Sequence, residues 1–338
     1  MTHAVHFSRH RWIIPAVGVA LLAILFAQIG PRQILALLSV LGLNILAIMA
    51  IFACHECVRA VAIGLCFPPD APRPPMRQRL RARFLGELAG TLTRMGPFVA
   101  EPSRAWIMTG RGLSGTHVYA AAAGEFIFNG CMSSVVTIAA ILLTSSAWAV
   151  NWPIRILSLA LLSLSAVHVT SVVVALTFRL RAISAVADAV RALPLVGNRL
   201  RPDPVQVRQV EDAVFGALVD RPRTLGLVVC LELLAQAILV FEVFWTLQSM
   251  GVPVSMRSAL LIHALGQGVG LIQFVGVTEA GYAVLFKWLG MTAAVGFATS
   301  LVKTLRSLAT SALGLLLLTQ TERMWLVPRT APEGSSDT

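Results

Sequence analysis

The strongest constraint on this chain is a series of apolar runs, each long enough to cross a lipid bilayer as a helix. A spanning helix needs about 20 apolar residues at a rise of roughly 1.5 Å per residue. The chain is 57% hydrophobic and 13% charged, a composition that excludes an ordinary soluble domain. The sequence therefore predicts an all-α integral membrane protein with about six transmembrane helices. The corresponding runs are 12–29, 34–54, 117–146, 155–178, 225–248 and 293–320.

Two further apolar stretches, 84–110 and 258–289, are interrupted by glycine, proline, threonine and charged residues. Broken helices persist inside a bilayer only where protein or a water-filled cavity satisfies the freed backbone groups. We therefore expect two re-entrant helical hairpins. The residues expected to form their breaks are Gly96, Pro97, Gly268, Gly270 and Gly276.

These runs also divide the chain into segments. An aspartate followed by proline, Asp203-Pro204, is typical of a helix start and predicts a short helix between the fourth and fifth spans. The expected segments are an N-terminal signal-anchor helix (1–33), a first membrane repeat (34–146), a fourth span with a cytoplasmic amphipathic linker (147–224), a second membrane repeat (225–322) and a polar cytoplasmic tail (323–338).

The distribution of arginine predicts the orientation of the spans. Arginines gather before the first span, in the proline-rich loop that follows the second, and in the linker between 179 and 223, whereas the alternate loops hold only Arg32 and Arg257. Basic loops favour the cytoplasmic side, so both termini are expected there. The two repeats then have opposite orientations, which is the arrangement of an inverted repeat. Chance similarity between glycine-rich membrane helices is the other interpretation.

The net charge of +11 has two interpretations, namely nucleic acid or anionic lipid as the partner. Because the basic residues lie mostly in short loops between apolar runs, anionic headgroups explain them better, and no nucleic-acid binding is expected. The sequence offers no second ligand pair for the cysteines at Cys54 and Cys57, so neither a metal nor another cofactor is expected. It also lacks a complete catalytic constellation, so we do not expect an enzyme.

Charged and polar side chains inside the apolar segments are the candidate functional residues, because a charge at the bilayer centre costs about 2.5 to 3.5 kcal/mol on insertion scales. Two of them, Glu101 and Arg104, are one helical turn apart and can form an ion pair beside the first break. The alternative for all of them is a purely structural role in ion pairs and interhelical hydrogen bonds. The candidates for a lipid-binding or translocation route are Glu101, Arg104, Glu125, Asn129, Glu279, Lys303 and Arg306.

Their spacing suggests partners. Glu125 and Asn129 lie on one face of the third span, at an interval of four residues. In the last span, Lys303 and Arg306 need an anion, and Glu279 is the nearest one in sequence. A second acidic stripe, formed by Glu232, Gln236 and Glu242, follows the fifth span.

The charged segments resemble those of the lysylphosphatidylglycerol synthase transmembrane-region family, a flippase-like group that includes hopanoid-operon members. The first likeness extends from Gly96-Pro97 through Glu101 and Arg104 to Glu125, and the second from Gly276-Val-Thr-Glu279 through Lys303 and Arg306. The second departs from the family pattern, since Phe274-Val-Gly276 stands where the family has Pro-Gly-Gly. No sequence corresponds to the family's aminoacyltransferase domain, so synthesis of aminoacylated lipid is not expected.

The resemblance implies translocation of a lipid between the leaflets of a bacterial inner membrane, through a polar central site. Its implied partners are membrane lipids, of an anionic, isoprenoid or hopanoid class, and enzymes of envelope-lipid biosynthesis. The alternative is a non-transporting membrane scaffold for such an enzyme. Without the resemblance, the sequence indicates only a polytopic protein with a polar central site.

Overall fold

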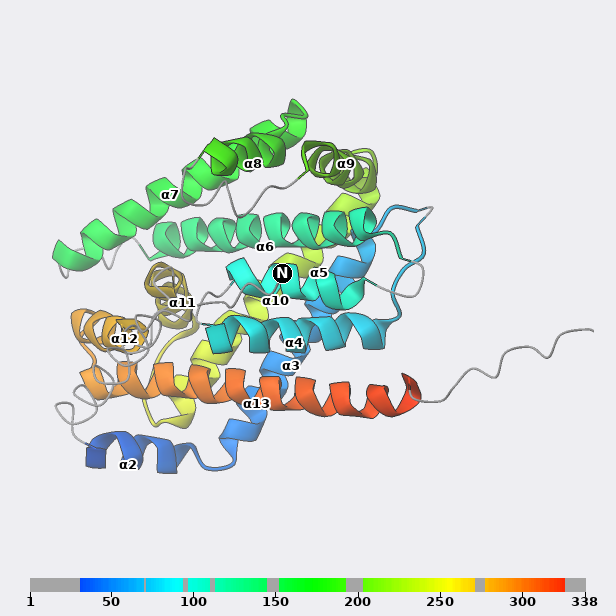
Figure 1. Cartoon of the computed structure of the whole chain (residues 1–338). Helices are drawn as coiled ribbons and strands as arrows, with labels where there is room; N and C mark the ends of the chain where they lie inside the picture. Colours follow the sequence, from blue (N-terminus) through cyan, green and yellow to red (C-terminus); the bar gives the residue numbers. More distant parts are fainter. Residues whose placement is uncertain are drawn as a thin grey trace, which may run out of the picture.

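The computed structural model describes residues 31–69, 71–93, 97–109, 113–144, 152–192, 203–270 and 277–325 (Figure 1). These residues form helices joined by short connections and no β-strand, which confirms the predicted all-α fold. The helices are α2 Pro31–Leu41, α3 Asn44–Leu65, α4 Met76–Thr93, α5 Pro97–Met108, α6 Gly115–Leu143, α7 Trp152–Thr177, α8 Ala182–Ala192, α9 Pro204–Val214, a π-helical turn Phe215–Val219, α10 Pro222–Ser249, α11 Met256–Gly270, α12 Val277–Trp288 and α13 Ala293–Trp325.

Four of these helices, α3, α6, α7 and α10, are long and apolar enough to cross a membrane. The chain is therefore a multi-pass membrane protein. Helix α13 has 33 residues and contains Lys303 and Arg306 in its middle part. The predicted first span, 12–29, lies outside the described residues, as does most of the predicted tail, 323–338.

The predicted span 34–54 differs from the structure, which divides it into α2 and α3. The division falls at Gly42, whose φ of 46° lies in the left-handed region that glycine adopts without a Cβ clash. Helix α3 begins two residues later and continues to Leu65. As a result, Glu56 and Arg59 lie inside a spanning helix rather than beyond its end.

Helix pairs occupy both predicted hairpin segments. In the first pair α4 packs against α5, and Pro97 is the first residue of α5. In the second pair α11 packs against α12, but α11 continues through Gly268 and ends at Gly270, so the structure has no break at Gly268. A Cβ at Gly268 would lie 3.0 Å from the Leu161 side chain, so this glycine allows α7 to approach α11 closely. The other expected break residues, Gly96 and Gly276, lie outside the described residues.

The two halves of the chain pack in a reciprocal pattern. The closest pair is α3 with α10, one from each predicted repeat, and they run antiparallel: the end of α3 shares a buried cluster with the start of α10, through Ile63 and Val228. The first helix of each hairpin packs on the last span of the other half, α4 on α13 and α11 on α6 (Figure 1). An inverted repeat would produce this pattern, because two halves related by symmetry make equivalent contacts with each other.

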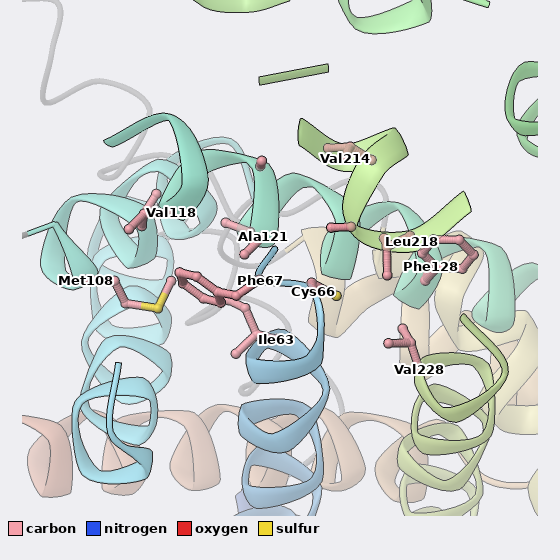
Figure 2. Close-up of a cluster of buried hydrophobic side chains, with 14 of the residues drawn as sticks. Ile63, Cys66, Phe67, Met108, Val118, Ala121, Phe128, Val214, Leu218 and Val228 are labelled. Atoms are coloured by element: carbon pink, nitrogen blue, oxygen red, sulfur yellow. The ribbon is translucent and has the colours of Figure 1, made fainter. Parts of the chain in front are cut away.

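The linker between α7 and α10 closes one end of the bundle. As predicted, α9 starts at Asp203-Pro204, and the Asp203 side chain accepts a hydrogen bond from the backbone N–H of Val205 at 2.9 Å. The buried Glu211 of α9 accepts hydrogen bonds from the start of α8, at the Ile183 backbone N–H and the Ser184 hydroxyl. Figure 2 shows the apolar cluster beneath, which joins Val214 and Leu218 with residues at the ends of the neighbouring helices, among them Cys66, Phe67, Val118 and Val228.

Candidate functional site

A cavity of about 350 Å³ lies among α3, α4, α5, α6, α12 and α13, so both helix pairs and both halves of the chain contribute to it. This volume is within the usual range of ligand pockets. The cavity is polar for the interior of a membrane protein. Its charged lining residues are four bases, Arg59, Arg104, Lys303 and Arg306, and three acids, Glu87, Glu101 and Glu279.

The cavity gathers almost all residues that the sequence singled out. Of the seven candidates, Glu125 lies behind the lining residue Arg59, and the others line the cavity directly. Those six are Glu101, Arg104, Asn129, Glu279, Lys303 and Arg306.

On the wall formed by α4 and α5, Arg104 is buried and pairs with two carboxylates. It forms the ion pair with Glu101 that their spacing predicted, and its Nη2 lies 3.5 Å from Glu87 Oε2. Glu87 in turn accepts a hydrogen bond from Ser307 Oγ of α13 at 2.9 Å. Gly86 makes this arrangement feasible, because a Cβ there would lie 2.2 Å from Arg104 Cγ. Hydrogen bonds between side chains that line the cavity thus connect the first helix pair to α13.

On the opposite wall, Arg306 of α13 pairs with Glu242 of α10. Its guanidinium carbon lies 3.8 Å from the centroid of the Phe52 ring, which is a cation–π contact. The sequence suggested Glu279 as the anion for Arg306, and the structure corrects this to Glu242. The acidic stripe of α10 is buried inside the protein. Its Glu242 is therefore close to Arg306 in space, although the two residues are distant in sequence.

Lys303 differs from the three arginines of the cavity. Its Nζ donates a hydrogen bond to Tyr282 Oη at 2.6 Å and lies 4.7 Å from the centroid of the Tyr282 ring. Each cavity arginine forms an ion pair, whereas Lys303 forms none with a carboxylate of the described residues. Lys303 therefore presents to the cavity an ammonium group whose hydrogen bond is to a hydroxyl group rather than to a carboxylate.

Behind the cavity, a cluster of buried charges joins α3, α4, α6 and α10. Glu125 is fully buried, and its Oε1 accepts hydrogen bonds from Arg59 Nε and Arg83 Nη1, both at 2.7 Å. Arg83 Nε also donates to Glu56 Oε2 at 2.8 Å. Glu232 of α10 completes the cluster, with Oε2 at 3.7 Å from Arg59 Nε. Arg59 belongs both to this cluster and to the cavity lining.

Sequence reasoning missed Glu56, Arg59 and Arg83. The predicted second span ended at residue 54, before the first two, and Arg83 was assigned to the basic loop that sets the orientation. The structure instead buries Arg83 in α4, with a side-chain exposure of 1%. The missed signal was a glutamate and an arginine one helical turn apart, Glu56 and Arg59, in an apolar run that continues to Leu65.

A neutral hydrogen-bonded chain leads from the cavity to α11. Asn129 Oδ1 accepts a hydrogen bond from Gln236 Nε2 at 3.2 Å, and Gln236 Oε1 lies 3.3 Å from His263 Nε2. Gln267 Nε2 contacts the same histidine nitrogen at 3.2 Å. Asn129 therefore both bonds across helices, as the structural interpretation expected, and lines the cavity. Within the described ranges, no group of three or more His, Cys, Asp or Glu side chains is arranged to hold a metal.

Fold and site together define a multi-pass α-helical membrane protein that encloses a charged cavity between its helices. Comparison with protein-family models matches residues 12–314 to the lysylphosphatidylglycerol synthase TM region. Because this match covers most of the 338 residues, the chain belongs to that family. Comparisons with curated proteins and with solved structures gave no match. The family match confirms the resemblance seen in the sequence and associates the chain with lipid metabolism or translocation.

Proposed function

We propose that this protein translocates a lipid between the two leaflets of a bacterial inner membrane, with the headgroup inside the cavity and the acyl chains in the surrounding lipid. The family association supports a lipid as the ligand. The observation on which the proposal depends is the ammonium group of Lys303, which bonds a tyrosine hydroxyl and forms no ion pair with the described acids, in a cavity built from both helix pairs.

A headgroup that crosses a membrane loses its hydration, so a protein that moves it must replace water with polar groups. The cavity offers such groups, since its lining includes the hydroxyl groups of Thr91, Ser300, Thr304 and Ser307 besides Lys303. A lysine ammonium binds phosphate as a point charge, and hydroxyl groups complete the coordination of its oxygens. A lipid phosphate is therefore the headgroup chemistry that these side chains fit.

The helix pairs α4–α5 and α11–α12 would form the movable barriers of the route. Contacts that hold α4 and α5 in place are polar: Arg104 bridges Glu101 and Glu87, and Ser307 of α13 bonds both Glu87 and Thr91. A phosphate in the cavity would offer Arg104 and Ser307 alternative partners. Exchange of these partners would let the helix pair move without leaving a buried charge unpaired.

Membrane orientation is part of the proposal. The arginine-rich linker between 179 and 223 favours the cytoplasmic side, and with it both chain ends. Anionic lipids would then gather near the basic face. Enzymes that make envelope lipids are the partners that would supply the substrate.

Leaflet exchange in liposomes tests the function. The purified protein would be reconstituted with fluorescent phospholipids, and a membrane-impermeant quencher would report the label remaining in the inner leaflet. We expect exchange by the wild-type protein and a loss of at least tenfold in Lys303→Gln. Lys287→Gln is the matched control, because Lys287 is the other lysine of the chain and is exposed in α12.

The same experiment separates transport from the scaffold alternative. If Lys303→Gln is as abundant and as heat-stable as the wild type but loses exchange, a scaffold role is excluded. If the wild-type protein moves none of the anionic, isoprenoid or hopanoid lipids tested, the proposed function is wrong.

A further inference from the structure

Glu232 is a buried acid without an adequate partner. Its side chain has an exposure of 0%, and neither carboxylate oxygen accepts a hydrogen bond from the described residues. Its nearest cation is Arg59, at 3.7 Å, and the Arg59 Nε already donates to Glu125 at 2.7 Å. An ionised carboxylate in such a place is strongly disfavoured, whereas a protonated carboxyl group carries no charge to compensate.

The charges of the cluster lead to the same conclusion. Its three acids are Glu56, Glu125 and Glu232, and its two guanidinium groups belong to Arg59 and Arg83. Glu56 and Glu125 accept hydrogen bonds from these arginines, which leaves Glu232 as the acid without a compensating charge. A single proton on Glu232 balances the cluster.

His55 is the titratable imidazole in contact with this cluster. Its Nδ1 lies 3.3 Å from Glu56 Oε1, and the ring stacks on Phe52. Glu56, however, is already neutralised by Arg83 at 2.8 Å. A proton on His55 would therefore leave Glu232 charged and uncompensated.

We propose that Glu232 is a proton-binding site that is coupled, through Arg59, to an anionic phosphodiester headgroup in the cavity. This inference rests on the proposed function for the nature of the cavity ligand. Arg59 lines the cavity and contacts both Glu125 and Glu232. Its guanidinium group would therefore interact with an anion in the cavity as well as with Glu232. A phosphodiester beside Arg59 adds negative charge and makes an ionised Glu232 still less favourable. At a pH high enough to ionise Glu232 in the ligand-free protein, binding of the anion then draws a proton onto Glu232, and protonation of Glu232 strengthens binding of the anion by the same factor.

Neutral polar side chains lie one helical turn from this acid. Gln236 follows Glu232 by one helical turn on α10, and it donates to Asn129, which lines the cavity. Arg59 thus contacts both the cavity and Glu232, while the amide pair connects the cavity to the next turn of α10. A protein with this coupling would carry a proton together with each anionic headgroup.

Proton uptake on ligand binding provides a direct test. A short-chain phosphatidylglycerol is a suitable probe, because its phosphodiester does not titrate near neutral pH and any proton taken up must go to the protein. The detergent-solubilised protein would be mixed with this lipid in a weakly buffered solution that contains a pH indicator. The measurement is repeated at rising pH, and once Glu232 is ionised in the ligand-free protein we expect the wild type to take up a proton and to bind as much as tenfold more weakly for each unit of rising pH. Glu232→Gln should bind the lipid without proton uptake and with an affinity that does not depend on pH.

Two control variants assign the proton. Glu211→Gln removes another buried carboxylate, in α9 and outside the cavity lining, and should leave proton uptake unchanged. Proton uptake that persists in Glu232→Gln, or that is lost only in His55→Gln, overturns the proposal. If Glu232→Gln does not fold, an infrared difference spectrum of the wild type decides instead: lipid binding must produce the C=O stretching band of a newly protonated carboxyl group, and its absence overturns the proposal.

The outcomes also separate this inference from the proposed function. Leaflet exchange of phosphatidylglycerol without any linked proton uptake would overturn the proton site and leave translocation intact. Linked proton uptake in a protein that exchanges no lipid would overturn translocation and support the site. Absence of phosphatidylglycerol binding at every pH would overturn the proton-coupled headgroup site.

Discussion

Arg59 of α3 and Glu125 of α6 form a buried ion pair, with Arg59 Nε 2.7 Å from Glu125 Oε1 and the carboxylate fully enclosed. The same oxygen also accepts from Arg83 of α4. One carboxylate thus holds three helices together directly behind the cavity. Because Arg59 also lines the cavity, a change in this ion pair would affect both the stability of the fold and the binding of a ligand.

Removal of this carboxylate should destabilise the protein strongly. Glu125→Ala leaves two buried guanidinium groups without their shared acceptor, and we expect a loss of about 3 to 5 kcal/mol in the free energy of unfolding. Asp188→Ala is the control, because Asp188 is exposed and its pair with the half-buried Arg191 should contribute about 0 to 1 kcal/mol. Thermal unfolding in detergent measures both. Equal effects of the two substitutions would contradict the central role of Glu125.

The close approach of α4 and α5 depends on Gly86. In Gly86→Ala, the new Cβ would lie 2.2 Å from Arg104 Cγ and 2.9 Å from the carbonyl oxygen of Ala100, so we expect destabilisation of about 1 to 3 kcal/mol. Gly226→Ala, in α10, meets no atom within 4 Å and should stabilise its helix by about 0.5 to 1 kcal/mol. Thermal unfolding of the two variants should therefore shift in opposite directions. A stable Gly86→Ala protein would show that the two helices can separate at little cost.

Tyr282 should support anion binding through Lys303. Tyr282→Phe removes the hydroxyl that accepts from Lys303 Nζ, and a hydrogen bond of this kind contributes about 0.5 to 1.5 kcal/mol. We therefore expect binding of short-chain phosphatidylglycerol to weaken about twofold to tenfold, and less than in Lys303→Gln, which removes the charge itself. Titration calorimetry measures both affinities. Tighter binding by Tyr282→Phe would instead indicate that the hydroxyl competes with the ligand for Lys303.

Double-mutant cycles should distinguish the two suggested partners of Arg306. The structure pairs it with Glu242, so Arg306→Ala and Glu242→Ala should be non-additive by about 0.5 to 3 kcal/mol in the free energy of unfolding. The pair Arg306→Ala and Glu279→Ala should show the smaller coupling energy. A larger coupling with Glu279 would restore the partner that proximity in sequence suggested.

Several features of this protein were readable from the sequence because they depend on residues close together in the chain. Apolar runs of sufficient length predicted the spanning helices α6, α7 and α10. Spacing of three residues predicted the Glu101–Arg104 pair, and the Asp203-Pro204 pattern predicted the cap of α9. The cost of burying charge in a bilayer indicated an internal polar site, where the structure indeed gathers six of the seven candidates.

Tertiary structure alone decided which charges meet. Arg83 has partners 27 and 42 positions away, Arg306 has one 64 positions away, and no local period connects them. Spanning helices have similar apolar surfaces, and lipid tails solvate those surfaces as well as another helix does, so hydrophobicity in the sequence does not encode which helices pack together. The sequence by itself determined that charges must be hidden inside a helical membrane protein. Only the packing of the helices determined that Lys303 would bond Tyr282 rather than a described acid and that Glu232 would be left over behind Arg59.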